Sequence, residues 1–340
     1  MTDDPTPSSA GADTAATEAA VDRFRETMEK IRAELGRVIV GQDEVLEQLL
    51  ITVLVGGHCL ITGLPGTAKT LMVQSLAQAL GLDFKRIQFT PDLMPTDVTG
   101  TDIIDTDPVT GARSWRFVPG PVFANVLLAD EINRTPPKTQ SALLEAMQEA
   151  RVTIRGVTHP LPAPFVVLAT QNPIELEGTY PLPEAQLDRF IFNVILDYLD
   201  ADQEMAVVER NTLGRGLPIV NACTDAAGLK EIQALVRQVP ISDAMNRLAV
   251  DIVRATRPEE ASAPVRVKEY VMYGASVRAA IFLSLAARAR ALLHGRYHVV
   301  PEDIATLAPP VLRHRLQLNY LAESERVSAD DLIREVAAAR

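Results

Sequence analysis

A short loop between an apolar run and a helix-forming stretch carries the residue types of a phosphate-binding site. The apolar run ends at Thr62, and the helix-forming stretch covers residues 71–80. In this order of strand, loop and helix, backbone N–H groups converge on one point and favour an anion there. Lys69 could reach the β- and γ-phosphates of a nucleotide, and the Thr70 hydroxyl could ligate Mg²⁺. The loop consists of Gly63, Leu64, Pro65, Gly66, Thr67, Ala68, Lys69 and Thr70.

Ala68 departs from the usual pattern of such loops, which has glycine at this position. Alanine keeps the backbone N–H, since only proline removes it. A methyl group fits if the backbone there is already helical, as we expect at the start of a helix. The alternative to a nucleotide site is a glycine-containing turn in which Lys69 and Thr70 follow by chance.

Two carboxylates follow a second apolar run. Residues 126–129 are Val-Leu-Leu-Ala, and Asp130 and Glu131 come directly after them. This pattern indicates a buried strand that ends at a site on its carboxyl edge. Asp130 would hold Mg²⁺, usually through water, and Glu131 would orient and polarise an attacking water. A solvated acidic turn is the alternative, and the upstream loop makes it the weaker one.

A third apolar run, residues 165–170, ends in Gln171, Asn172 and Pro173. An amide at the end of a neighbouring central strand could hydrogen-bond the γ-phosphate or the attacking water, and Asn172 fits that role. An ordinary Asn-Pro turn is the alternative. The three segments in this order indicate a nucleotide site more strongly than any one of them alone.

The three segments together resemble the MoxR family of AAA+ ATPases, and further motifs extend the resemblance over about residues 21–320. The most specific part runs from Asp130 to Gln148, since it goes well beyond the motifs of ATPases in general. Alanine at position 68 is usual in this family. The matching segments are Ile39–Gln42, Gly63–Thr70, Leu128–Gln140, Ala169–Pro173, Leu182–Phe190 and Gly274–Ala279.

The resemblance implies several site roles. Val40, Gly41 and Gln42 would lie near the adenine base, and Asn172 would be the sensor-one residue. The proline that usually precedes the sensor-two arginine is Val277 here, so the entry into that helix could differ slightly.

Two arginines would act on ATP. Arg189 matches the arginine finger, which serves ATP bound to a neighbouring subunit, and Arg278 matches the sensor-two arginine of the lid. A guanidinium is permanently charged and presents a planar fork to phosphate oxygens. Without the resemblance, Arg189 could instead pair with Asp188 or with another nearby carboxylate, and Arg278 could lie on a solvated helix face. Arg134 is a second finger candidate of lower rank.

Composition narrows the function classes. The chain has 340 residues, a net charge of −11, two cysteines and five histidines. The acidic balance argues against broad nucleic-acid binding. No apolar run approaches bilayer length, the N-terminus has no signal-peptide pattern, and the histidines show no metal pattern. Too few cysteines are present for a disulfide framework, so we expect a cytoplasmic protein.

The expected fold is an α/β AAA+ core, a parallel sheet flanked by helices, followed by an all-α lid. We expect a disordered tail at 1–20, the ATPase domain at 21–197 with a helix over about 21–35, and a helical lid without strands at 198–340. Hairpins are predicted near 103–118 and 151–161. By resemblance, the first faces the pore of a ring. Trp115 could contact a substrate there or pack on its own domain.

The resulting interpretation is an ATPase that hydrolyses ATP with Mg²⁺ at the subunit interfaces of a ring, most often a hexamer in this family. The resemblance implies a chaperone-like remodelling of client proteins, such as metal insertion, often with a von Willebrand factor A domain partner. Two alternatives are a nucleic-acid motor of the same clade and a nucleotide-dependent switch with little turnover. The sequence does not identify the client, the oligomer number or the hairpin that contacts the client.

Overall fold

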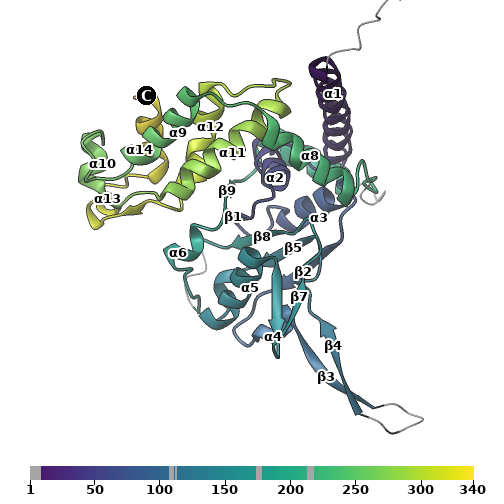
Figure 1. The fold of residues 1–340 in the computed structure, drawn as a ribbon. Coiled ribbons are helices and arrows are strands. Elements are labelled where there is room, and N and C mark those ends of the chain that lie inside the picture. Colours follow the sequence, from purple (N-terminus) through teal and green to yellow (C-terminus); the bar gives the residue numbers. More distant parts are fainter. Residues whose placement is uncertain (1–8, 107–110, 112, 174–177, 213–217) are drawn as a thin grey trace, which may run out of the picture.

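A five-stranded parallel sheet forms the centre of the structure, a computed structural model that describes residues 9–106, 111, 113–173, 178–212 and 218–340. Strands buried on both faces must be apolar on both, and all five residues of β5 are buried. The predicted α/β core is confirmed. The strand order is β2 (Phe84–Gln88), β5 (Val126–Asp130), β8 (Val166–Gln171), β1 (Cys59–Gly63) and β9 (Phe192–Leu196), all parallel (Figure 1).

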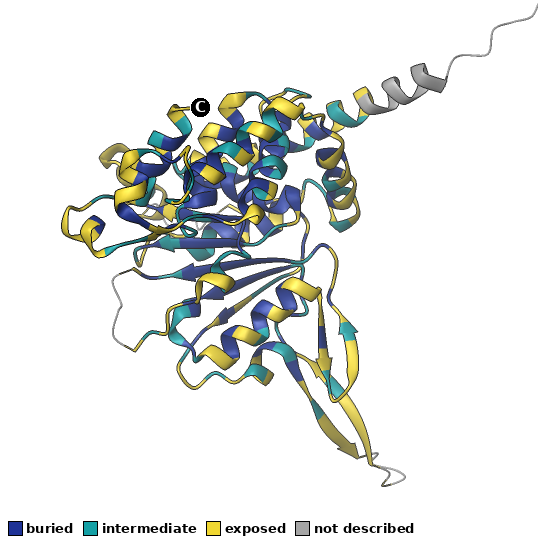
Figure 2. Cartoon of the chain, turned by 60° about the vertical axis from the view of Figure 1, so that its left-hand side comes forward, coloured by how far each residue is buried: buried dark blue, intermediate teal, exposed yellow. Residues whose placement is uncertain are grey.

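The sheet separates two apolar cores, because successive side chains of a strand point to opposite faces. Ile61 and Leu128 belong to one core, and Leu60 and Leu127 to the other. Figure 2 shows the buried strands between the layers that cover them. The first core includes α1 (Ser9–Gly36), α2 (Asp43–Val55), α3 (Lys69–Ala79) and C-terminal helices, and the second includes α5 (Pro137–Glu149).

The N-terminal helix is longer than the sequence predicted. α1 begins at Ser9, so residues 9–20 are helical instead of disordered, and residues 1–8 of the expected tail lie outside the described residues. Residues 9–20 contain six alanines, and alanine has the highest helix propensity. The helix therefore continues beyond the turns that packing fixes. The predicted helix over about 21–35 is confirmed, and Phe24, Met28, Ile31 and Leu35 on its inner face are all buried.

Both predicted hairpins are present. The first, β3 (Gly100–Thr106) and β4 (Arg113–Pro119), follows the short helix α4 (Pro95–Thr99) and projects away from the rest of the molecule (Figure 1). Most of its predicted turn lies outside the described residues. The second consists of β6 (Arg151–Ile154) and β7 (Val157–Pro160). It turns at Arg155 and Gly156, whose φ angles of 48° and 80° match a tight hairpin turn.

The two hairpins contact each other through aromatic rings. Phe117 stacks on His159 with ring centroids 4.0 Å apart, and the Arg155 guanidinium lies 3.8 Å from the centroid of the Trp115 ring. Trp115 is nevertheless 56% exposed. One face of this side chain therefore packs on its own chain, and the remainder faces solvent.

Helices dominate the chain after β9, as predicted, but a small antiparallel sheet is also present. It pairs β10 (Val271–Tyr273) with β11 (Gln317–Leu318). The expectation of no strands after residue 197 was therefore wrong, because strands of two or three residues are too short to show an alternating pattern. None of the described helices is long and apolar enough to cross a membrane. The helices are α7 (Ala201–Thr212), α8 (Ala226–Gln238), α9 (Asp243–Ala255), α10 (Val265–Tyr270), α11 (Val277–Leu293), α12 (Pro301–Leu312), α13 (Tyr320–Ser324) and α14 (Ala329–Ala338).

A buried ionic cluster joins these C-terminal helices to α2. Asp303 of α12 is fully buried, with one carboxylate oxygen 2.7 Å from Arg290 Nη1 of α11 and the other 2.7 Å from Arg296 Nη1. Arg290 Nε also lies 3.2 Å from a carboxylate oxygen of Glu47 in α2. Burial acts to raise the pKa of Asp303, but hydrogen bonds from Arg296, the Val300 N–H and Arg290 outweigh it and lower that pKa.

Asp303→Asn is expected to reduce the free energy of unfolding by about 3 kcal/mol, because it removes the buried one of the two carboxylates that balance the charge of Arg290. The folded pKa of Asp303 lies below its unfolded value of about 3.9. The stabilisation by Asp303 is therefore complete above the unfolded pKa of about 3.9, and it is lost as the pH falls through the folded pKa. Urea unfolding followed by circular dichroism measures both effects.

Asp251→Asn is the matched control. Asp251 pairs with Arg247 on the surface of α9, where the Arg247 side chain is 72% exposed, so its loss should cost less than about 1 kcal/mol. Equal losses in the two variants would contradict a special role for the buried cluster.

Candidate functional site

The carboxyl ends of β5, β8 and β1 bring the predicted residues to one edge of the sheet. These three strands are adjacent, and they are followed respectively by Glu131, Asn172 and the loop that begins after Gly63. Asn172 is buried, 7% exposed. Open parallel sheets bind ligands at this edge. Gly63 and Asn172, which are about 110 positions apart in the chain, therefore lie at the same edge of the sheet.

The loop wraps around the Lys69 side chain. Its ammonium group donates to the carbonyls of Gly63 at 2.6 Å and Leu64 at 2.8 Å, and the Thr67 hydroxyl donates to the Leu64 carbonyl at 2.8 Å. Burial lowers the pKa of Lys69, and the charges of Asp130 and Glu131 act in the opposite direction. Thr70 is half-buried in the first turn of α3.

The conformation at Ala68 corrects the sequence-based expectation. Ala68 has φ 61° and ψ 23°, a left-handed conformation, and α3 begins only at Lys69. The backbone was expected to be helical there. A left-handed alanine costs about 1–2 kcal/mol relative to the right-handed conformation. The loop adopts it because Gly66 at φ 81° and Ala68 together turn the chain sharply before the helix.

Two further site residues share this left-handed conformation. Gln42 has φ 61° and Glu131 has φ 56°, so three of the six non-glycine residues with positive φ in the described chain belong to predicted site segments. Such backbone strain gathers at functional sites, where the surrounding structure fixes it.

Asp130 is held from two sides. Its Oδ2 lies 2.6 Å from Arg86 Nη2 of β2, and its Oδ1 accepts a hydrogen bond of 2.6 Å from the buried Thr170 hydroxyl of β8. Thr170 also accepts a 2.8 Å hydrogen bond from the Glu131 N–H. This one hydroxyl therefore fixes both carboxylate-bearing residues relative to the neighbouring strand. Neither Thr170 nor Arg86 was singled out from the sequence.

The Glu131 carboxylate is bound by two side chains. Gln88 Nε2 donates to Oε2 at 2.6 Å, and Arg134 Nη1 lies 3.0 Å from the same atom. Arg134 thus contacts the site of its own chain. Gln88 was missed by the sequence analysis; it lies at the end of β2, the neighbour of β5 in the sheet.

The oxygen atoms of Asp130 and Thr70 suit a magnesium ion that also binds phosphate. Asp130 and Thr70 offer oxygen ligands, and among the described residues no group of three or more His, Cys, Asp or Glu side chains could hold a metal by itself. Mg²⁺ commonly uses one or two protein oxygens together with substrate phosphates and water. The residues present therefore fit Mg²⁺.

A cavity of about 390 Å³ opens beside the loop. Its walls are mainly apolar, and Val40 and Gln42 are among the lining residues as predicted. Gln42 Nε2 also donates to the Asp197 carbonyl at 3.0 Å. Gly41 has φ 64°, a left-handed conformation that favours glycine, and a Cβ there would lie 2.6 Å from the end of the Gln203 side chain, which would have to shift. Four further residues that line this cavity were not identified from the sequence: Tyr198, Leu199, Val207 and Val208.

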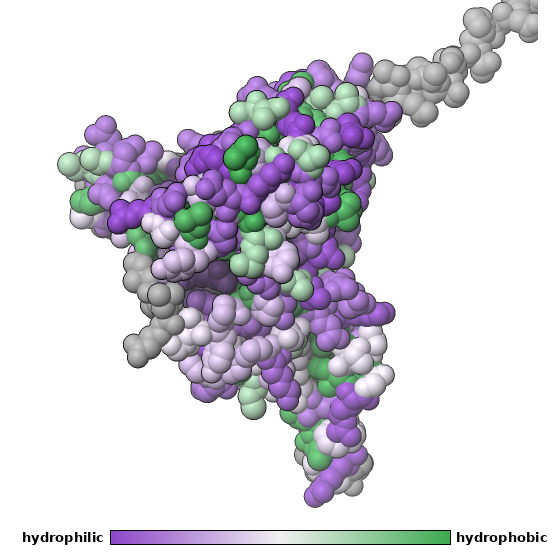
Figure 3. Space-filling view, turned by 90° about the vertical axis from the view of Figure 1, so that its left-hand side faces the viewer, coloured by the Kyte–Doolittle hydropathy of each residue, from purple (hydrophilic) through white to green (hydrophobic). Residues whose placement is uncertain are grey.

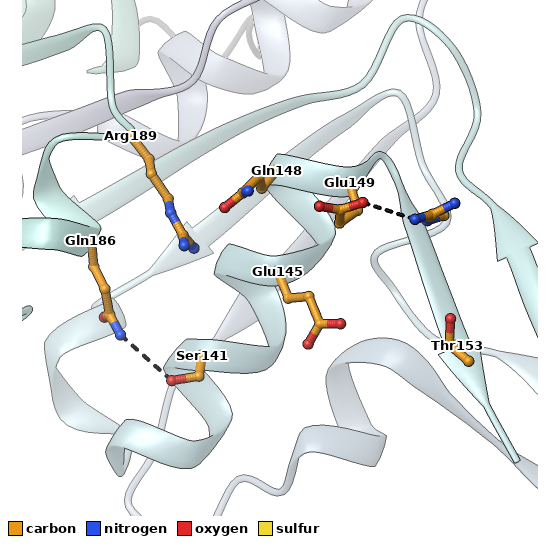
Figure 4. A pocket seen from close by; sticks show the side chains of 8 residues that line it. Ser141, Glu145, Gln148, Glu149, Thr153, Gln186 and Arg189 are labelled. Carbon is orange, nitrogen blue, oxygen red and sulfur yellow. Dashed lines mark hydrogen bonds and ion pairs between the residues drawn. The ribbon is translucent and has the colours of Figure 1, made fainter. Parts of the chain in front are cut away.

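Arg189 lies outside the apolar cavity. It lines a second, polar cavity of about 540 Å³ over α5, which shares no lining residue with the first (Figure 4). Its Nη1 donates to the Leu144 carbonyl at 3.0 Å. Glu145, Gln148 and Glu149 lie around it on α5. Arg189 therefore does not line the apolar cavity of its own chain.

Arg278 lies in the first turn of α11, near residues 188–191. Its Nη1 lies 3.0 Å from Asp188 Oδ2, and the same carboxylate binds Arg315. α11 begins at Val277 after the capping residue Ser276, so valine in place of proline still permits a helix start here. The alternative pair of Arg189 with Asp188 is not found. Asp188 binds Arg278 and Arg315 instead.

Comparisons with known proteins agree with this arrangement. A family model described as "ATPase family associated with various cellular activities (AAA)" matches residues 58–192, and one described as "AAA lid domain" matches 264–336. Chaperone MoxR1 of Mycobacterium tuberculosis is 45% identical over 310 residues, which cover 91% of this chain and 81% of that protein. YeaC of Bacillus subtilis, an uncharacterized protein, is 43% identical over 305 residues, 90% of this chain and 91% of its own length.

A crystal structure from Cytophaga hutchinsonii has the same fold. It superposes with a TM-score of 0.88 at 44% identity and covers 96% of this chain and 98% of that one. Identity at this level over nearly the whole length, together with the matched core and lid, shows common ancestry as well as a common fold. The chain belongs to the MoxR family of AAA+ ATPases.

Proposed function

We propose that this protein binds and hydrolyses ATP with Mg²⁺. The observation that carries the proposal is the meeting of Lys69, Asp130 and Glu131 at the carboxyl edge of the sheet, beside an apolar cavity. The cavity between Val40, Met72 and Tyr198 has the size and apolar walls that suit an adenine ring. The loop N–H groups then face the phosphates at the N-terminus of α3.

Each group has a distinct role in hydrolysis. Lys69 neutralises the β- and γ-phosphates. Thr70 and Asp130 would hold Mg²⁺, which would supply charge stabilisation to the phosphate oxygens. Glu131 orients the attacking water and accepts its proton, and Asn172 positions the γ-phosphate. Arg278 joins the γ-phosphate from the lid. The contacts of Glu131 with Gln88 and Arg134 hold its carboxylate at the edge of the site.

Lys69→Ala is expected to weaken ATP binding and abolish turnover, because the phosphates lose their cation. Glu131→Gln should keep ATP binding and lower turnover by about 10²–10⁴-fold, since the amide cannot accept the proton. Phosphate release and calorimetric titration with Mg²⁺-ATP measure the two effects.

Glu259→Gln, the same change at an exposed position of the lid, should leave both quantities unchanged. Turnover of Glu131→Gln at the wild-type rate would contradict the assigned base. Turnover too slow to detect in the wild type, with tight ATP binding, would favour the nucleotide-dependent switch.

We further infer that the protein works as a hexameric ring in which Arg189 serves the ATP of the adjacent subunit. The support is the position of Arg189, which lines a polar cavity outside the apolar one. Arg134 is the weaker finger candidate, because its guanidinium pairs with Glu131 of its own chain. A finger supplied by another subunit can add about 10³–10⁵-fold in rate.

Mixing two inactive variants tests this arrangement. Arg189→Ala subunits keep a nucleotide site but no finger, and Lys69→Ala subunits keep a finger but no nucleotide site. In an equal mixture, about a quarter of the interfaces should combine an intact nucleotide site on one subunit with an intact Arg189 on its neighbour. About a quarter of the wild-type turnover should then be restored. Mixing Arg189→Ala with a Lys69→Ala/Arg189→Ala double variant is the control. An absence of recovery would show that Arg189 is not a finger between subunits.

The β3–β4 hairpin is the proposed contact with a client protein. Ile104 and Trp115 are register partners on one face of this hairpin, and they are 55% and 56% exposed. Figure 3 shows hydrophobic side chains on this projecting element at the bottom of the view. Exposed apolar side chains on an extended arm suit a polypeptide. The family resemblance adds the finer expectation of client maturation or metal insertion with a von Willebrand factor A domain partner.

A cytoplasmic location belongs to the same proposal. Cys59 and Cys223 are not joined in a disulfide, which fits a reducing compartment.

A substrate trap distinguishes a client protein from nucleic acid. Tagged Glu131→Gln with ATP should retain a specific protein from an extract of its own cells and release it in ADP. Adding Trp115→Ala should abolish this retention without changing ATP binding, whereas Tyr320→Ala, an equally large change at an 82% exposed lid position, should not. Retention of nucleic acid instead would favour the motor.

A further inference from the structure

Asp188 connects two arginines that serve different nucleotides in the proposed function. It immediately precedes Arg189, the proposed finger for the neighbouring subunit. Its Oδ2 lies 3.0 Å from Nη1 of Arg278, the proposed ligand of the chain's own γ-phosphate. The Ser276 hydroxyl also donates to this carboxylate, at 3.1 Å from Oδ2. One side chain thus contacts the start of α11 and adjoins the finger.

The second oxygen of Asp188 has a permanent partner. Arg315 Nε lies 2.8 Å from Oδ1, and the Arg315 side chain is only 2% exposed. Its Nη2 also donates to the carbonyls of Asp188 at 2.9 Å and Phe190 at 2.6 Å. Burial lowers the pKa of Arg315 to about 10, and Asp188 acts in the opposite direction, so the guanidinium remains charged at neutral pH. A buried charge of this kind cannot leave its carboxylate.

The two partners of Asp188 therefore differ in how easily they can be exchanged. The Arg278 side chain is 47% exposed, whereas Arg315 is enclosed. Arg278 and Ser276 both belong to the start of α11, so a movement of this helix displaces both together. Arg315 alone neutralises Asp188. With Arg278 also bound, the group of three side chains carries one net positive charge.

This charge bears on Arg189. A net positive group repels the adjacent guanidinium and favours its extension toward phosphate on another subunit. Once Arg278 leaves, the group is neutral and Asp188 Oδ2 can accept a hydrogen bond from Arg189 itself. The carboxylate then competes with the neighbour's phosphates for the finger.

We propose that Asp188 is a positioning residue that couples the two nucleotide sites of one chain: when Arg278 moves from Asp188 to the chain's own γ-phosphate, Asp188 withdraws Arg189 from the neighbour's ATP. This inference rests on the proposed function, in which Arg189 acts between subunits. A subunit with ATP bound thereby offers its neighbour a weaker finger than a subunit without ATP. Adjacent sites would then hydrolyse ATP in turn and not together.

Mixed assemblies test the coupling. The acceptor subunit carries Arg189→Ala, so all turnover occurs on its ATP with the finger of a donor subunit. Donors carry either Lys69→Ala, which does not hold ATP, or Glu131→Gln, which holds ATP without hydrolysing it. We expect acceptor turnover to be at least about 5-fold lower with the Glu131→Gln donor, the lower end of typical coupling between sites.

Asp188→Asn in the Glu131→Gln donor should remove this difference, because an amide does not attract Arg189 as a carboxylate does. Asp251→Asn in the same donor, an acid-to-amide change on the surface of α9, should preserve it. Equal turnover with the two original donors would overturn the coupling. A difference that persists in the Asp188→Asn donor would also overturn it.

A second variant decides the question even if Asp188→Asn fails to fold. Arg278→Ala in the Lys69→Ala donor removes the exchangeable partner of Asp188 while the donor holds no nucleotide. Acceptor turnover should then fall to the level measured with the Glu131→Gln donor. Unchanged turnover would contradict the proposal. An absence of turnover in every mixture would instead refute the finger between subunits, so failure of the proposed function is distinguishable from failure of the coupling.

Discussion

The parallel alignment of β1, β5 and β8 is the constraint on which the rest of the structure depends. Parallel strands end at the same edge, so the loop after β1, the carboxylates after β5 and the amide after β8 are forced together. The Thr170 hydroxyl fixes this alignment at the site itself, because it contacts both Asp130 and the Glu131 backbone. A shift of either strand by one residue would exchange its buried faces and separate these groups.

The site is strained, and the cores on both sides of the sheet stabilise it. Gln42, Ala68 and Glu131 each adopt a left-handed backbone at a cost of about 1–2 kcal/mol. Lys69 gives up solvent and binds carbonyls of its own loop. Neither feature would persist in an isolated peptide. They persist here because α3 and β5 are anchored by side chains such as Val73, Leu76 and Leu128, all nearly fully buried.

Ionic contacts connect the C-terminal helices to the sheet region at two places. Asp303 joins α11 and α12 through Arg290, which also contacts Glu47 of α2. Asp188 joins the start of α11 to the segment after α6 (Glu184–Leu187). The first contact is buried and fixed, and the second includes a half-exposed arginine that can be exchanged. A movement of the C-terminal helices would therefore act most readily at Asp188, next to the proposed finger Arg189.

The sequence by itself determined the elements and most of the site. Apolar runs followed by Gly63–Thr70, Asp130 and Asn172 predicted strands with polar carboxyl ends. This was possible because an apolar run and the polar residues that end it are local features of the sequence. Helix propensity was underestimated at residues 9–20, where alanine extends α1 beyond its packed turns.

Tertiary structure alone decided which partner each charged residue has. The sequence placed Asp188 beside Arg189, yet the carboxylate binds Arg278 and Arg315, which are 90 and 127 positions away. Arg86, Gln88 and Tyr198 entered the site region for the same reason. The left-handed conformation of Ala68 likewise depends on how β1 and α3 pack against the sheet. Long-range contacts and backbone strain are set by the packing of whole elements, which no local pattern of residues encodes.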